Sequence, residues 1–146
     1  MNSLNRLLPV VLGLALVVSV NAGVAHAAKL RDVCIVNRAG AVSLNTFIFR
    51  DVEPLSPGGA ISLRGLFFTL ARRVAPFHGS AAIVSDGTVR VGLFVHSSAE
   101  STNDFTVAGV TDTDFVGTLS VDTNGDFVPD STLVMELADC ATITIP

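Results

Sequence analysis

Oxygen-bearing side chains recur at alternate positions in one short run near the C-terminal end of the chain. Asp122, Asn124, Asp126 and Asp130 occupy the first, third, fifth and ninth positions of DTNGDFVPD. A tight turn directs alternate residues inward, so oxygens at this spacing can converge on one hard cation such as Ca²⁺. The run therefore predicts a calcium site at these four residues. An Asn-Gly hairpin flanked by solvated acids is the alternative.

The same nine residues resemble the acidic calcium loops of thrombospondin type 3 repeats, which read Asp-x-Asp/Asn-x-Asp-Gly-x-x-Asp. The resemblance implies calcium as the cofactor, and no other cofactor is expected. This chain has a single copy, with Phe127 where the family has glycine, and Leu133 stands where an EF-hand loop ends in a carboxylate. Asp112 and Asp114 could add oxygens if their loop folds over the run.

Residues for catalysis are sparse. A transition-metal site would need His78 and His96 to converge with a carboxylate. The serines lie in no Gly-x-Ser-x-Gly context. The C-terminal acids could supply the carboxylate pair of a glycoside hydrolase, but Trp and Tyr, the usual sugar-stacking residues, are absent. We therefore expect no enzymatic activity and keep a hydrolase as the third hypothesis.

The N-terminal residues 1–27 have the pattern of a signal peptide. Arg6 precedes an apolar run over 7–20, which is shorter than the roughly 20 residues of a membrane-spanning helix. Ala25-His26-Ala27 then fits a small-x-small cleavage site. The remaining residues, 28–146, are expected to form one domain, secreted or periplasmic, with no transmembrane segment.

Two cysteines, Cys34 and Cys140, lie near the two ends of the predicted domain. An oxidising compartment favours a disulfide between them, which ties the first and last elements together.

The charged residues are unevenly distributed along the chain. Residues 28–90 hold eight Lys and Arg against four Asp and Glu, whereas later residues hold nine acids and no Lys or Arg. This distribution argues against nucleic acid as a partner.

Short apolar runs separated by turn signals every 8–14 residues indicate an all-β fold. We expect an antiparallel barrel or a closed sandwich of roughly eight short strands, with strands at 33–36 and 46–49. The stretch 62–74 fits a strand better than a short helix, but both remain open.

Two hairpins are expected, around Asp86-Gly87 and Asn124-Gly125. A two-residue turn at the first pairs Ser85 with Thr88 and continues in register. It places one set of side chains on the inner face: Ala82, Val84, Val89, Val91, Leu93 and Val95. At the second, Val121 would face Val128, with a bulge or strand break at 129–130 because proline cannot donate to a ladder.

All nine aromatic residues are phenylalanine. A barrel lined with Phe47, Phe49, Phe67, Phe68, Phe94 and Phe115 could enclose a small apolar ligand, and a plain packed core is the alternative. The leading functional hypothesis is thus a non-catalytic binding protein that carries such a ligand. The second is a structural or surface-interaction module with a protein partner, stabilised by calcium.

Overall fold

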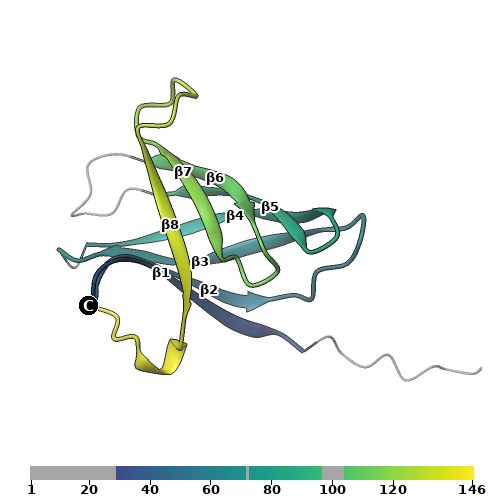
Figure 1. The fold of residues 1–146 in the computed structure, drawn as a ribbon, viewed down its shortest axis with the longest axis horizontal. Coiled ribbons are helices and arrows are strands. Elements are labelled where there is room, and N and C mark those ends of the chain that lie inside the picture. The colour runs from purple at the N-terminus through teal and green to yellow at the C-terminus, as the bar shows by residue number, and fades with distance from the viewer. Residues whose placement is uncertain (1–28, 72, 97–103) are drawn as a thin grey trace, which may run out of the picture.

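Eight antiparallel strands form a closed barrel in the computed structural model, which describes residues 29–71, 73–96 and 104–146 (Figure 1). The predicted signal peptide, 1–27, lies outside the described residues. The strands, followed by one 3-10 turn, are β1 (Arg31–Ala39), β2 (Val42–Val52), β3 (Ala60–Thr69), β4 (Val74–Ser85), β5 (Thr88–Val95), β6 (Phe105–Thr111), β7 (Gly117–Asp122), β8 (Ser131–Ala138) and η1 (Cys140–Thr142).

Each strand pairs with its neighbour in sequence, and β8 returns to pair with β1. Cys34 faces Ala138 and Val36 faces Glu136 at this closing seam. The structure thus confirms an all-β fold and selects the up-and-down barrel over the sandwich. Within the described residues, no helix is long and apolar enough to cross a membrane.

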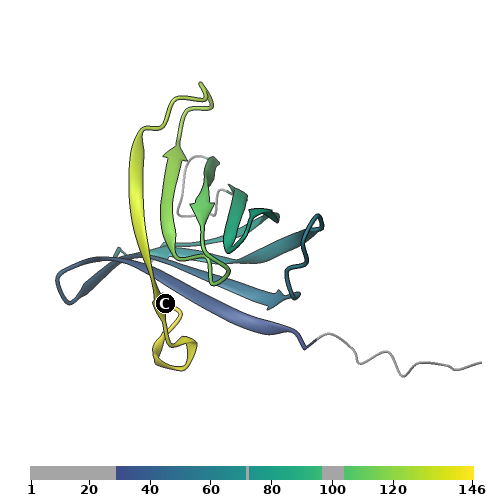
Figure 2. The same ribbon diagram turned by 45° about the vertical axis from the view of Figure 1, so that its right-hand side comes forward.

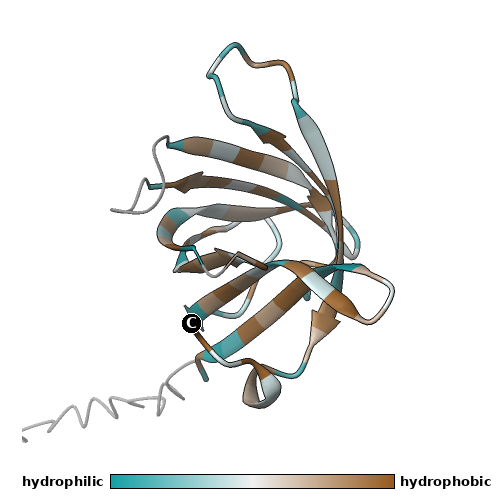
Figure 3. Cartoon of the chain, turned by 90° about the vertical axis from the view of Figure 1, so that its left-hand side faces the viewer, coloured by the Kyte–Doolittle hydropathy of each residue, from teal (hydrophilic) through white to brown (hydrophobic). Residues whose placement is uncertain are grey.

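The described residues of the stretch 62–74 form no helix. The prediction of a strand is confirmed for 62–69, which belong to β3, and the next strand, β4, begins at Val74. Phe67 of β3 pairs with Phe47 of β2 on one side and with Ala75 of β4 on the other. Pairing on both edges satisfies the backbone N–H and C=O groups that a helix would have satisfied internally. Hydrophobic and polar residues alternate along the strands, as a barrel with one buried face requires (Figure 3).

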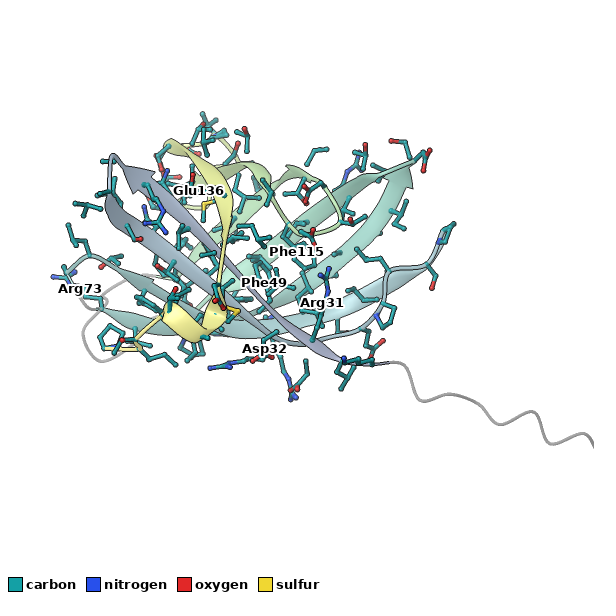
Figure 4. All side chains as sticks on the ribbon, turned by 60° about the horizontal axis from the view of Figure 1, so that its bottom comes forward. Arg31, Asp32, Phe49, Arg73, Phe115 and Glu136 are labelled. Atoms are coloured by element: carbon teal, nitrogen blue, oxygen red, sulfur yellow. A yellow bond between two sulfur atoms is a disulfide. The ribbon has the colours of Figure 1, made fainter. Side chains whose placement is uncertain are left out.

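The barrel interior is filled by phenylalanine rings that pack against one another. Phe49 stacks on Phe115 at a centroid distance of 4.6 Å and meets Phe77 edge-on at 5.1 Å. Phe47 lies 4.8 Å from Phe67. Exposed fractions of these five side chains range from 0% to 7%. Figure 4 labels Phe49 and Phe115, which lie between the strands of the barrel.

Two of the six phenylalanines expected inside lie elsewhere, and two rings that pack in the core were missed. Phe68 points outward on β3 into a second apolar cluster, and Phe94 packs beside His78 at 5.7 Å. Phe77 takes an inner position instead, and Phe105 of β6 packs against the core at 5.4 Å from Phe67. Adjacent residues of a strand face opposite sides, so Phe67 and Phe68 cannot both point inward.

The predicted disulfide between Cys34 and Cys140 is present, with a Cα–Cα distance of 5.3 Å. It fastens the C-terminal segment to the outer face of the barrel. There Cys34, Ile48 and Phe68 are buried beneath Cys140 and Ile143. In Figure 2 this segment folds back below β8, beside β1. The disulfide therefore joins the two ends of the domain, and it holds the C-terminal segment over an apolar patch on the outside of β1–β3.

The β4–β5 hairpin has the expected Asp86-Gly87 turn but not the expected register. Ser85 faces Thr88, then the register shifts and Ile83 faces Val89. The extra residue, Val84, bulges outward and is 47% exposed. One added residue reverses the faces of everything beyond it. The inner residues of β4 are consequently Ala81 and Ile83, and the assignment of Ala82 and Val84 to the inner face was wrong.

The β7–β8 connection is longer than the predicted two-residue turn. Val121 faces Ser131, not Val128, and residues 123–130 form a loop that projects beyond the barrel (Figure 1). The predicted strand break at 129–130 is confirmed, because β8 begins at Ser131. Met135 then points inward and is 1% exposed.

Candidate functional site

The projecting 123–130 loop is organised around the carboxylate of Asp122. Backbone N–H groups of Asn124 and Gly125 donate to its Oδ1 at 3.1 and 2.7 Å, and that of Phe127 donates to its Oδ2 at 2.9 Å. Phe127 adopts a φ of +65°, in the left-handed region that favours glycine. Its side chain is 95% exposed at the tip.

The remaining acidic side chains of the loop also accept backbone hydrogen bonds. Asp126 accepts from Val128 N–H at 2.8 Å. Asp130 accepts from the Thr123 hydroxyl and N–H at 2.5 and 2.6 Å, and these bonds lower the pKa of Asp130 below its ordinary value. Asn124 Oδ1 accepts from Asp126 N–H at 3.0 Å. These oxygens are directed at the loop's own backbone.

In the described part of the chain, no three His, Cys, Asp or Glu side chains are grouped as metal ligands would be. Binding of Ca²⁺ at Asp122, Asn124, Asp126 and Asp130 would require their oxygens to turn from these N–H groups toward a common centre. The calcium site remains a prediction.

Chelation tests it. If the loop binds Ca²⁺ in the exported protein, removing the ion with chelator should lower the melting temperature, because a ligand bound only to the native state stabilises that state. The Asp126→Ala variant should melt at the same temperature with and without chelator. An unchanged melt of the unaltered protein in chelator would remove the hypothesis.

Asp112 and Asp114 cannot join this loop. They precede β7, whereas the 123–130 loop follows it, so the length of the strand separates them. Asp112 Oδ1 instead accepts the N–H groups of Asp114 and Val116 at 2.8 and 3.0 Å. These bonds shape the turn that inserts Phe115, at 0% exposure, into the barrel. The expectation of additional oxygens from these two residues was wrong.

The divided charge of the sequence is partly paired where the barrel closes. Arg31 at the start of β1 contacts Asp114 at 2.7 Å, and Arg38 at its far end contacts Glu136 of β8 at 2.5 Å. Figure 4 labels Arg31 and Glu136 on these elements. The basic N-terminal half therefore meets the acidic C-terminal half along β1, at the β6–β7 turn through Arg31 and at β8 through Arg38. Both pairs are exposed, so each contributes little to stability.

Asp32 gives the fold a defined response to acid. The backbone N–H of Asp51 donates to Asp32 at 3.1 Å and Arg50 pairs with it, and these contacts lower its pKa below the ordinary value of 3.8. A depressed native pKa contributes stability that is present above the unfolded value and lost as pH falls through the native value. We expect the free energy of unfolding to decrease below about pH 4, and less steeply in Asp32→Asn.

Urea unfolding at successive pH values between 2 and 6 measures this slope, with Asp86→Asn at an exposed turn as the matched control. Equal slopes for the Asp32 variant and the control would contradict the assignment.

A groove runs over the outer face of β4–β7, with a volume of about 600 Å³. Small side chains make its floor, and the two rim valines, Val84 and Val110, are 47% and 51% exposed. A Cβ added at Gly92 would meet no atom within 4 Å, so the missing side chain deepens the groove. The floor residues are Ser80, Ala82, Gly92, Ala108 and Ser120.

Sequence reasoning missed this groove because its lining depends on the outward bulge at Val84. With Val84 and Ala82 assigned to the interior, neither side chain could line a groove on the outer face. Val134 of β8, which is 66% exposed, adds to this apolar surface. It lies on the same outer face as Val110, because Thr118 of β7 pairs with Val110 on one side and with Val134 on the other. An exposed apolar surface of this kind is typical of an interaction site.

His78 and His96, which the sequence offered as metal ligands only together with a carboxylate, lie together beyond one end of the groove. His78 Nδ1 is 2.6 Å from His96 Nε2. The ring of Phe94 packs beside both, with centroid distances of 5.7 and 5.0 Å. Within the described residues no carboxylate completes a three-ligand group with them.

Together these features define an eight-stranded up-and-down barrel with an aromatic core, a disulfide-anchored C-terminal segment and a groove on its outer face. The chain matches no protein-family model, and comparisons with curated proteins and with solved structures found no match. The function must therefore be argued from this chain's own surface.

Proposed function

We propose that the chain is a secreted or periplasmic, non-catalytic interaction module that binds a protein partner through the groove on the outer face of β4–β7. The observation that carries the proposal is the groove itself, bordered by the exposed Val84 and Val110. Interaction surfaces combine exposed apolar side chains with a polar margin, and Arg90 supplies a cation beside the groove.

The packing of the interior favours this proposal over an apolar ligand carried inside the barrel. Phe47, Phe49, Phe67, Phe77 and Phe115 contact one another, and a ligand would have to displace these rings. Protein interiors are packed as densely as organic crystals, so such a displacement would be costly.

The carboxylates offer less support for the hydrolase hypothesis. In the described C-terminal part, Asp114 and Glu136 pair with arginines. Asp122, Asp126 and Asp130 accept hydrogen bonds within an exposed loop. A glycoside hydrolase instead needs two carboxyl groups about 5–10 Å apart across a substrate cleft.

Site-specific photocrosslinking in the exporting cell tests the proposal. A photoreactive amino acid replaces Val110 at the rim of the groove, and in the matched control it replaces Val42, a valine of similar exposure (47%) at the start of β2. We expect one discrete protein adduct from position 110 and none of that mass from position 42. Equal labelling from both positions, or no adduct from position 110, would contradict the proposal.

A blocking variant refines this test. Gly92→Val should fill the floor of the groove without disturbing the barrel, because an added Cβ there meets nothing within 4 Å. It should abolish the adduct formed from position 110 and leave the melting temperature unchanged.

A further inference from the structure

The histidine pair has a geometry that a metal ion could use. His78 on β4 has Phe94 of β5 as its cross-strand partner, so His96, two residues further along, lies diagonally opposite it. Diagonal neighbours on one face of an antiparallel pair are within reach of long side chains. The ring centroids of the two histidines are 4.7 Å apart, and the Nδ1–Nε2 distance is 2.6 Å.

This contact directs at least one nitrogen lone pair at the other ring. A hydrogen bond between two imidazole nitrogens holds a single proton, with one nitrogen as donor and the other as acceptor. A metal ion that replaces the proton can use both lone pairs. With metal–nitrogen bonds of about 2.0–2.1 Å, two ligands of one ion lie about 2.9–3.3 Å apart. The rings would need to separate by a few tenths of an ångström and to tilt, so that the two nitrogens, which now face each other along one hydrogen bond, both point at the ion.

The surroundings of the pair leave room for a metal ion. His78 is exposed and His96 is half-buried, so water can complete the coordination. The cross-strand partner of His78 on β3 is Arg64, and the guanidinium of Arg64 pairs with Asp51. This ion pair offsets the positive charge of Arg64 beside His78. Phe94 packs beside both rings.

We propose that His78 Nδ1 and His96 Nε2 together chelate one borderline divalent transition-metal ion, Cu²⁺ or Zn²⁺, on the outer face of β4 and β5. Imidazole nitrogens suit these ions, whereas Ca²⁺ and Mg²⁺ take oxygen ligands. Among divalent first-row ions, Cu²⁺ binds a given nitrogen site most tightly. The site is distinct from the acidic 123–130 loop and does not depend on a partner in the groove.

Titration of the untagged protein with Cu²⁺ tests the site. The chain has three histidines, and the third, His26, falls in the predicted signal peptide. We expect one tightly bound ion per chain, with an electron paramagnetic resonance spectrum that shows coupling to two nitrogens. Zn²⁺ should shift the ring-proton NMR signals of both histidines together.

His78→Gln and His96→Gln should each weaken the affinity for Cu²⁺ at least about tenfold, because either change converts a chelate into a single ligand. Asp126→Asn in the acidic loop is the control and should leave this affinity unchanged. Both histidine variants alter surface side chains, and circular dichroism will verify that they fold. The proposal is overturned if either histidine variant binds Cu²⁺ as tightly as the unaltered protein, or if the ion binds through one nitrogen only.

Discussion

Replacing both cysteines, in the double variant Cys34→Ser/Cys140→Ser, should lower the free energy of unfolding by about 4–5 kcal/mol. The bond joins residues 106 apart in sequence, so its loss releases almost the entire domain in the unfolded state. In the chain-entropy account, the stabilisation grows with the length of the closed loop. The C-terminal segment also loses its anchor, which exposes the outward-facing Ile48 and Phe68 beneath it.

Urea denaturation of the double variant, the oxidised protein and the reduced protein measures the effect. The double variant and the reduced protein should agree. Ile143→Ala provides an independent readout, because Ile143 packs on the covered cluster. It should destabilise the oxidised protein more than the double variant, in which the segment is no longer held. A double variant that unfolds at the same urea concentration as the oxidised protein would contradict this description.

Gly65→Ala should lower the free energy of unfolding by at least about 3 kcal/mol, because overpacking at this position cannot be relieved by rotating a side chain. A Cβ built on Gly65 lies 1.8 Å from the backbone oxygen of Ile48 and 2.7 Å from a ring carbon of Phe77. Gly65 faces Phe49 and Phe77 across the two neighbouring strands. Its missing side chain thus lets β2 and β3 approach closely beside the aromatic core.

Gly92→Ala is the matched control, since it makes the same change in a strand of the same barrel. Its Cβ meets nothing within 4 Å, so stability should stay the same or rise slightly, as glycine within a strand is unfavourable. Thermal unfolding of the two variants separates two effects on stability, the overpacking caused by an added Cβ and the loss of a glycine from a strand. Equal melting temperatures for both variants would show that the approach of β2 and β3 is not as tight as described.

Much of the fold could be predicted from the sequence because its signals are local. Short apolar runs separated by turns indicated strands, and Cys34 and Cys140 required the ends of the domain to meet. The register of β4 was not predictable in this way. Ala81 and Ile83 are as apolar as Ala82 and Val84, so alternation does not distinguish the inner set from the outer set. The bulge at Val84 decides it, and no turn residue marks that position.

The candidate sites also differ in whether their residues are close together in the sequence. The acidic loop was visible as a pattern because its residues are close in sequence, although the direction of its carboxylates depends on backbone N–H groups that only the structure places. His78 and His96 are 18 residues apart, and they meet only through the observed β4–β5 register. The groove combines residues from four strands, and no single stretch of sequence describes it.

The central claim is that the interior is filled by its own side chains and that binding takes place on the outer face. Native mass spectrometry of the protein, purified from its native source without refolding or chelation, tests this claim most directly. We predict the mass of the disulfide-bonded chain, with metal ions or a protein partner as the only additional masses. An organic molecule that is retained by the folded chain and released only on denaturation would contradict the account and support a ligand carried inside the barrel.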